Sequence, residues 1–414
     1  MLGSWILLRI VAPLASDRIS QYAYNNNGTH ISHHVKHFDF IVVGTGTSGS
    51  VLAHRISRNS REKVLVLEAG GADDAPEIKN PPSFMKLFGN EQYDWNLKTA
   101  EQPNLKNRRL RWPRGKTLGG CSSLNAMIYQ RGNAADYDEW EQKLGLEGWN
   151  YRSMLTYFKK SMIQSNGELD ARYHGYDGKW RIQNLIHPHE LSLAAIESIH
   201  KVQGLPINHD TNGEHQIGIG LNQVNMDRLG RRHSLSDAFL DNETLKRKNL
   251  YVRLHAQVTR VIVDPQSKKA LGVEYIDMKT GEKFEAYASK EVILAAGAVH
   301  SPHILLLSGI GPENVLKQHN ISVVHHLPGV GQNLLDHLQT GAMYRLKPQY
   351  RHMSLEEEQG VMQVTDWLFN GKGPLTSNGG EVNGFFVSPY SEDPNLPDLQ
   401  YLGIPGYFVD HASR

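Results

Sequence analysis

The folds open to this chain are limited above all by a glycine-rich stretch near its start, FDFIVVGTGTSGSVLAHRIS at residues 38–57. An apolar run at 40–43 leads into three glycines spaced G-x-G-x-x-G, and apolar residues at helical spacing follow at 47–59. A second apolar run, KVLVLE, occupies 63–68. A strand, a glycine turn, a helix and a strand in this order predict parallel strands joined by a crossover helix, the nucleus of an α/β fold.

The three glycines suit a turn that binds a dinucleotide. Gly44 permits the tight turn, Gly46 lets the backbone approach a pyrophosphate, and Gly49 lets the helix pack closely on the strand. The N-terminus of that helix presents free N–H groups and the positive end of the helix dipole to phosphates. Glu68 ends the second strand, 19 positions after Gly49, and can accept hydrogen bonds from both ribose hydroxyls. Because a carboxylate repels a 2′-phosphate, NADP is disfavoured, while NAD and FAD both stay open.

The composition excludes several classes of function. The 414 residues carry a formal net charge of +1, so no basic field for nucleic acid is present. The single cysteine, Cys121, rules out an internal disulfide and a cysteine-rich zinc site. Neither the H-E-x-x-H pattern of zinc hydrolases nor the G-x-S-x-G pattern of serine hydrolases occurs, and no metal site is predicted.

Residues 1–36 are expected to form a leader outside the folded domains. The apolar run at 1–16 ends in small residues, as a secretory signal peptide does, and an extracellular location is one interpretation. However, Arg9 interrupts the run and no basic residue precedes it, which favours an unordered leader. The run is too short to cross a bilayer, so no transmembrane span is predicted and the localisation stays undetermined.

A second glycine-rich segment, RWPRGKTLGGCSSLNAMIYQRGN at 111–133, is polar and rich in small residues. Gly119 and Gly120 remove side chains where a ligand could come close, and Ser122 and Asn125 supply hydrogen-bond donors. An alternative is an ordinary surface loop. Because loops of this length are uncommon unless they are functional, we expect the segment to lie beside the dinucleotide.

Four separated motifs resemble those of the glucose–methanol–choline (GMC) oxidoreductases, which are FAD-dependent and act on alcohols. They are the glycine turn with Glu68, GKTLGGCSSLN at 115–125, GAVHSPHILLLSGIG at 297–311 and LPGVGQNLLDH at 327–337. They occur in the order that the family shows, and the resemblance covers about residues 37 to 414. Within the family the chain is most similar to the insect glucose dehydrogenase branch, whose members reduce quinone-like acceptors.

The resemblance implies that the cofactor is FAD. The residues it places at the pyrophosphate and the adenosine ribose are Gly44, Gly46, Thr47, Ser48, Gly49 and Glu68. The residues it places along the flavin half are Thr117, Gly120, Asn125, Ala126 and Met127. Val258 matches the position whose backbone recognises adenine. Leu124 stands where the choline oxidase branch has a histidine bonded covalently to the flavin, which implies noncovalent FAD. Cys121 departs from the usual Ser, Thr or Gly, and we expect it to pack rather than react.

The activity that the resemblance implies is oxidation of a CH–OH group of a small alcohol or sugar. In the family a histidine takes the hydroxyl proton, a hydride passes to flavin N5, and the electrons leave to a quinone-like acceptor. The catalytic histidine and its His or Asn partner lie late in the family's sequences and are expected beyond residue 414, so the chain is expected to be truncated and none of its 21 histidines is assigned. One alternative is a catalytically inactive flavin-binding or interaction protein, and another is a nicotinamide-dependent dehydrogenase.

The expected fold is α/β, or α+β overall, with a Rossmann-like FAD-binding domain and a second, mixed-sheet substrate domain that is incomplete here. We expect the FAD-binding domain to comprise residues 37–160 and 231–337. The substrate domain would then comprise 161–230 and 338–414.

Within these domains, helices are predicted at 134–160 and 232–241. The core positions predicted in the first are Trp140, Leu144, Leu155, Tyr157 and Phe158. Strands are predicted at 250–263, 271–275, 284–287 and 291–298, and no strand pattern is evident at 161–230.

Overall fold

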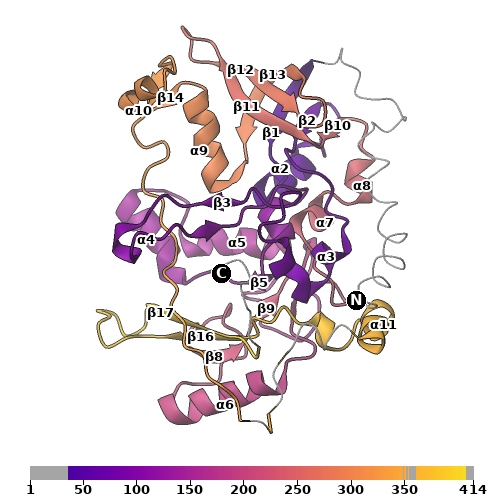
Figure 1. Ribbon diagram of the computed structural model, residues 1–414, viewed down its shortest axis with the longest axis vertical. Helices are drawn as coiled ribbons and strands as arrows, with labels where there is room; N and C mark the ends of the chain where they lie inside the picture. The colour runs from indigo at the N-terminus through magenta and orange to yellow at the C-terminus, as the bar shows by residue number, and fades with distance from the viewer. Residues whose placement is uncertain (1–35, 348, 351–352, 354–359, 407–414) are drawn as a thin grey trace.

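The computed structural model describes residues 36–347, 349–350, 353 and 360–406 (Figure 1). The leader predicted at 1–36 lies outside the described residues except for Lys36. In Figure 1 the largest sheet is at the top, and a smaller sheet with α6 beneath it is at the bottom. No helix within the described ranges combines the length and apolar character needed to cross a membrane.

The largest sheet has six strands in the order β10-β2-β1-β13-β12-β11. Their bounds are β1 His37–Val43, β2 Val64–Leu67, β10 Leu250–Arg253, β11 Ala256–Val263, β12 Ala270–Asp277 and β13 Lys283–Leu294. The four strands from β10 to β13 in this order are parallel, and β12 and β11 continue the sheet in antiparallel fashion. Helix α2, Thr47–Ile56, is the crossover between β1 and β2, so the predicted strand–turn–helix–strand unit is confirmed.

Both faces of this sheet are covered, which is why its central strands read as uninterrupted apolar runs. Ile41 and Leu65 pack on one face with residues of β11, β12 and α9, Gly297–Leu307. Val42 and Val64 pack on the other face with Ala53 of α2 and other apolar residues. Burying each such side chain stabilises the fold by about 1.5–3 kcal/mol, so the sheet provides a rigid edge for the glycine turn.

Two strand predictions need correction. The run at 250–263 is two strands, because His255 adopts φ 55° between β10 and β11. This break sends β10 to one edge of the sheet and β11 to the other. The predicted strands at 284–287 and 291–298 are one continuous strand, β13. Its first half pairs with β12 and its second half with β1, so it links the antiparallel and parallel parts of the sheet.

The helix predicted at 134–160 is two helices, α4 Ala134–Leu144 and α5 Tyr151–Ser161. Gly145 ends α4 in the left-handed conformation, with φ 66°, and the chain turns before α5 begins. Three of the five predicted core positions are wrong, because Trp140, Leu144 and Tyr157 are exposed. Leu155 and Phe158 are half-buried.

A mixed sheet was expected for the second domain, but the strands of the two smaller sheets were not located from the sequence. Their orders are β5-β9-β7-β6 and β17-β16-β8. The strands are β5 Ile128–Tyr129, β6 Met162–Gln164, β7 Trp180–Asn184, β8 Gly218–Leu221, β9 Gln223–Val224, β16 Val382–Phe386 and β17 Leu399–Gly403. Strands of two to five residues are too short to show a period of two in the sequence. In β8 a Cβ on Gly220 would lie 1.9 Å from the carbonyl oxygen of Asn208, so close backbone approach explains this glycine.

The remaining elements are short apart from two helices. The helices are α3 Pro76–Lys79, α6 Glu190–Gln203, α7 Leu235–Phe239, α8 Asn242–Leu245, α10 Glu313–Gln318 and α11 Val361–Asn370. The 3₁₀ turns and short strands are η1 Pro81–Leu87, β3 Leu97–Lys98, η2 Pro103–Leu105, β4 Arg111–Trp112, η3 Gly120–Ser123, β14 Ile310–Gly311, β15 His325–His326 and η5 Pro374–Thr376. The helix predicted at 232–241 is therefore only α7, which starts after a capping box formed by Ser234 and Asp237.

Candidate cofactor site

The glycine turn between β1 and α2 is packed against the end of β13. A Cβ on Gly44, which has φ 95°, would lie 2.6 Å from the carbonyl oxygen of Ala295. A Cβ on Gly49 would lie 1.9 Å from the carbonyl oxygen of Gly44. Both positions therefore require glycine, as the motif predicts, because strand and helix approach too closely for any side chain.

The N-terminus of α2 is open to a ligand. Its N-cap residue, Gly46, has no side chain to cap the helix, and the first turn holds no acidic residue. Thr47 and Ser48 are exposed there. Uncapped N–H groups and the helix dipole favour a negatively charged group at this end, which suits a pyrophosphate.

Glu68 is buried at the end of β2 and is hydrogen-bonded to the glycine turn. Its Oε2 accepts from the backbone N–H of Thr45 at 2.9 Å and from the Thr45 hydroxyl at 2.6 Å. Its Oε1 accepts from the N–H of Gly70 at 2.9 Å. Burial raises the pKa of Glu68, and the hydrogen bonds from Thr45 and Gly70 act in the opposite direction. The carboxylate therefore holds the turn in place, and a carboxylate's four lone-pair sites leave capacity for a further donor.

Thr45 is a site residue that the sequence analysis missed. It is fully buried between the first two glycines, and it ties the turn both to Glu68 and to the second glycine segment, because its carbonyl accepts from Gly119 N at 3.1 Å. A hydroxyl residue between two motif glycines is a weak signal on its own.

The second glycine segment lies directly against the first. A Cβ on Gly120, which has φ 54°, would be 2.8 Å from the Cα of Gly46. Thr117 is fully buried, and its hydroxyl donates to the carbonyls of Gly71 and Ala72 at 3.1 and 3.0 Å. The structure thus brings the two glycine segments together, while the Thr117 hydroxyl serves the fold.

The turn from Asn125 to Met127 follows η3. Asn125 is exposed and its Oδ1 accepts from the N–H of Met127 at 3.0 Å and from Arg232 Nη1 at 3.0 Å. The carbonyl of Ala126 accepts from Asn378 Nδ2 at 2.6 Å. Met127 is fully buried with φ 61°. Arg232 and Asn378 were not foreseen, because each lies over one hundred residues away and no motif links them to this turn.

Val258 lies near the start of β11 and is mostly buried in the core beneath the sheet. Its neighbour two residues earlier, Ala256, donates its backbone N–H to the carbonyl of Glu68 at 2.7 Å. The residues predicted for the adenosine end, Glu68 and Val258, therefore lie in two segments that are far apart in the sequence and hydrogen-bonded to each other.

The donor set and the shape of this region fit a dinucleotide. The two glycine segments form a cradle that a Cβ would fill, the α2 terminus carries uncapped N–H groups, and Glu68 presents a buried carboxylate. No group of three or more His, Cys, Asp or Glu residues suitable for a metal ion is found in the described ranges.

The histidines of the third motif lie beside this region on α9. The ring of His300 is 4.3 Å from the ring of Trp95, centroid to centroid, and burial lowers the pKa of His300, with His303 contributing in the same direction. His303 itself is exposed. His300 is thus a packing residue in this structure.

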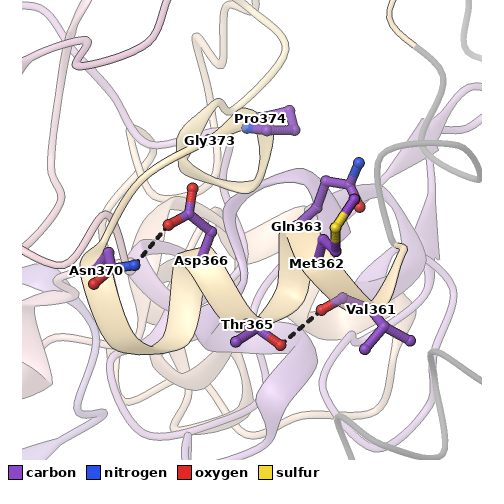
Figure 2. A pocket seen from close by; sticks show the side chains of 8 residues that line it. All are labelled: Val361, Met362, Gln363, Thr365, Asp366, Asn370, Gly373 and Pro374. Carbon is purple, nitrogen blue, oxygen red and sulfur yellow. Dashed lines mark hydrogen bonds between the residues drawn. The ribbon is translucent and has the colours of Figure 1, made fainter.

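A hollow of about 470 Å³ lies at α11 (Figure 2). None of the residues lining it belongs to the glycine segments. Its polar side chains bond within the helix, since Thr365 donates to the carbonyl of Val361 at 2.8 Å and Asn370 donates to Asp366 at 2.7 Å. We therefore assign no function to this hollow.

Comparison with known proteins gives consistent matches. The sequence profile of GMC oxidoreductases matches residues 38–339. The chain is 38% identical over 381 residues to the alcohol dehydrogenase [acceptor] of Pseudomonas putida, covering 91% of this chain and 67% of that protein. It is also 38% identical to the mitochondrial choline dehydrogenase of Homo sapiens, covering 91% of this chain and 62% of the relative.

Solved structures show the same fold. A formate oxidase of Aspergillus oryzae RIB40, described in a study of FAD modification, superposes with a TM-score of 0.73 at 29% identity, covering 85% of this chain and 62% of the oxidase. The pyridoxine 4-oxidase of Mesorbium loti superposes with a TM-score of 0.66 at 32% identity, covering 70% of this chain and 55% of that enzyme. The chain thus spans about two thirds or less of the length of these proteins. The mixed α/β fold predicted from the sequence is confirmed.

Proposed function

Since the chain belongs to the GMC oxidoreductase family, we propose that it oxidises a CH–OH group of a small alcohol or sugar with FAD. FAD is the cofactor of this chain, and when bound it accepts a hydride from the substrate carbon at its N5 atom. The hydroxyl proton goes to a base, the substrate becomes a carbonyl compound, and two electrons leave with the acceptor. The nicotinamide alternative loses its support, because the family and its solved neighbours use a flavin.

The observation that carries this proposal is the contact between the two glycine segments. A side chain on Gly120 would collide with the backbone of Gly46, at the uncapped N-terminus of α2. In the proposed arrangement the pyrophosphate and ribose are held by Gly44, Gly46, Thr47, Ser48, Gly49 and Glu68. The flavin half is held by Thr117, Gly120, Asn125, Ala126 and Met127, and adenine by the backbone of Val258.

We further propose that FAD is held without a covalent bond. Leu124, at the position of the covalent histidine in the choline oxidase branch, is packed with Ile78 and Leu87 in an apolar cluster. A leucine side chain has no atom that can bond to the flavin. Acid precipitation should therefore release all of the yellow colour into the supernatant.

The proposed electron acceptor is quinone-like, as in the insect glucose dehydrogenase branch. The support is the resemblance of the motifs to that branch, together with a relative whose name specifies an acceptor. A quinone takes the two electrons with two protons and leaves as a hydroquinone, so the reaction balances.

The proposed domain division assigns 37–160 and 231–337 to FAD and 161–230 and 338–414 to the substrate. The six-stranded sheet draws only on the first pair of ranges, and the β17-β16-β8 sheet only on the second. The strand β5, which joins β9, makes the 128–129 segment a bridge between the two.

No base is proposed among His54, His174 and His233, of which the first two are buried and the third is half-buried. Burial lowers the pKa of both His54 and His233 to about 4, and each ring nitrogen that is bonded serves the fold. His174 is buried between Asp210 and Arg131, with its two ring nitrogens at 2.8 and 3.3 Å from them.

The test is anaerobic spectroscopy of the purified chain. If the proposal holds, the protein carries flavin absorbance, an alcohol or sugar bleaches it, and a quinone restores it. The competing function, a catalytically inactive flavin-binding protein, predicts flavin absorbance that no donor bleaches while dithionite still does. A colourless protein that takes up no added FAD would refute both.

A further inference from the structure

Arg232 contacts the Asn125–Met127 turn with its guanidinium, although the side chain is almost completely buried. Its Nε donates to the carbonyl of Ile78 at 2.8 Å, and its Nη1 donates to the carbonyl of Ser122 at 3.1 Å. Nη1 also donates to Asn125 Oδ1 at 3.0 Å. Removing a guanidinium from water is costly, so a buried arginine that joins Ile78, Ser122 and Asn125 indicates a specific requirement for this local geometry.

These contacts determine which end of the Asn125 amide points outward. Both groups that reach the amide, the guanidinium of Arg232 and the backbone N–H of Met127, can only donate. The atom between them must therefore be the oxygen, and its two lone pairs are both used. The other atom of the amide is therefore the nitrogen, Nδ2. Asn125 is exposed, and Nδ2 has no hydrogen-bond partner among the described residues.

The same turn is held from its other side by Asn378. Asn378 is fully buried and donates to the carbonyl of Ala126 at 2.6 Å. Met127, next in the chain, is kept in the left-handed conformation at φ 61°, which costs a side-chain-bearing residue about 1–2 kcal/mol. A turn that is strained and gripped by two buried polar side chains has one fixed geometry, which is what a ligand contact needs.

We propose that Arg232 is a positioning residue for the flavin, which fixes the Asn125 side chain so that its Nδ2 donates a hydrogen bond to an acceptor atom of the flavin ring system. This inference rests on the proposed FAD site. Its content goes beyond that site, because it assigns a role to a residue that does not touch the cofactor and specifies which atom of Asn125 does.

The charge of Arg232 gives the arrangement a chemical consequence. Burial lowers the pKa of Arg232 to about 9, while Asp237 and Asp73 raise it, so the guanidinium is charged at neutral pH. A cation bonded to the amide oxygen polarises the amide and strengthens Nδ2 as a donor. A flavin gains negative charge on reduction, and a stronger donor stabilises that charge. Arg232 should therefore raise the reduction potential of the flavin.

The test compares Arg232→Met, Arg232→Lys, Asn125→Asp and the double variant R232M/N125D with the wild-type chain. Asn125→Asp is nearly isosteric and keeps the bonds from Arg232 and Met127, but it has no N–H to donate. The matched control is Arg231→Met, since Arg231 is the neighbouring residue, is exposed, and bonds to Asp227 rather than to the turn. The measurements are the FAD dissociation constant, the flavin reduction potential, and the flavin absorption spectrum.

We expect Arg232→Met and Asn125→Asp each to weaken FAD binding about 10-fold, as loss of one hydrogen bond that involves a charged group predicts. Both should lower the reduction potential and shift the spectrum, the double variant should add little to either single one, and Arg231→Met should match the wild type. Arg232→Lys should recover part of the potential, because it restores a charge without the planar fork. If Arg232→Met does not fold, Asn125→Asp and Arg232→Lys still decide the matter.

An unchanged potential and spectrum in Asn125→Asp, or equal and fully additive losses in the two single variants, would overturn the inference and leave Arg232 a structural residue. A wild-type chain that binds no FAD is a different outcome, because it refutes the proposed function itself.

Discussion

Replacing Gly120 by alanine should move the two glycine segments apart, weaken FAD binding and lower the stability of the fold. The new methyl carbon would lie 2.8 Å from the Cα of Gly46, where ordinary contacts between carbon atoms are about 3.5–4.0 Å. Because the obstacle is backbone rather than a flexible side chain, one segment must move by several tenths of an ångström. Gly46 is the N-cap of α2, so the movement displaces the helix end that faces the pyrophosphate.

Two costs can be separated in this substitution. The left-handed conformation of Gly120, φ 54°, costs an alanine about 1–2 kcal/mol. The steric conflict adds about 1–3 kcal/mol, as overpacking of a well-packed site typically does. The sum is a large part of the 5–15 kcal/mol by which ordinary domains are stable.

Gly145→Ala is the control for this experiment. Gly145 has φ 66° at the end of α4, and a Cβ there meets nothing within 4 Å. This variant therefore carries only the conformational cost of about 1–2 kcal/mol. The assays are urea unfolding with and without FAD, and titration of the folded apoprotein with FAD.

Gly120→Ala should lose about 1–3 kcal/mol more than Gly145→Ala and should bind FAD at least 10-fold more weakly, since each 1.4 kcal/mol is a factor of ten. Gly145→Ala should bind FAD as the wild type does. If both variants bound FAD equally well, the contact between the glycine segments would not be the basis of the site.

Three further predictions concern single buried groups. Thr45→Val should weaken FAD binding and lower stability by about 1.5–3 kcal/mol, because Glu68 loses the 2.6 Å bond from the hydroxyl. Thr365→Val, at an exposed position of α11, is the control, and equal unfolding midpoints in urea for the two variants would contradict the prediction. Trp367→Phe should lower the free energy of unfolding by about 1–3 kcal/mol, because the buried indole N–H donates to the Gly230 carbonyl at 3.1 Å and the variant leaves that carbonyl unpaired. Trp149→Phe, at an exposed site, should lower it much less in the same urea unfolding experiments. Stability should fall as pH drops from 6.5 to about 4, by about 1.4 kcal/mol per pH unit for each of His54 and His233. The reason is that burial lowers their pKa values in the folded chain, so the unfolded chain binds the protons first. In urea unfolding across this range the free energy of unfolding should depend less steeply on pH for His54→Leu, and an unchanged dependence would contradict the assignment.

The parts of the fold that could be predicted are those where a local pattern has one physical solution. The β1–α2–β2 unit follows from its glycine spacing and apolar runs. Within it, a Cβ on Gly49 would lie 1.9 Å from the carbonyl oxygen of Gly44, so this close approach is encoded locally. The same applies to the capping box of Ser234 and Asp237, although the helix it starts is shorter than the sequence indicates. Local periodicity says nothing about length when tertiary contacts end an element.

The parts that could not be predicted depend on contacts between distant residues. β13 is one strand rather than two, because β12 and β1 each need a partner and occupy successive halves of it. The strands between 161 and 230 are stabilised by pairing with β5 and β16, and their own sequences are too short to show a period. Gly145 could have been recognised as the end of a helix, since glycine commonly follows the last helical residue.

The cofactor site also combines features that the sequence predicts with contacts that it does not. Its glycines are visible in the sequence through their motif spacing. Arg232 and Asn378, by contrast, act through hydrogen bonds to groups far away in the sequence, which no motif marks. The site is assembled from segments near residues 44–49, 68, 117–127, 232 and 378, and FAD would contact or depend on all of them. A ligand that binds only the assembled state stabilises it by RT ln(1 + [FAD]/Kd), about 2.7 kcal/mol at a hundredfold excess over Kd. FAD should therefore protect the Asn378 turn, η5 and the Arg232 segment from hydrogen exchange as strongly as the glycine turn itself, although none of the three needs to contact FAD.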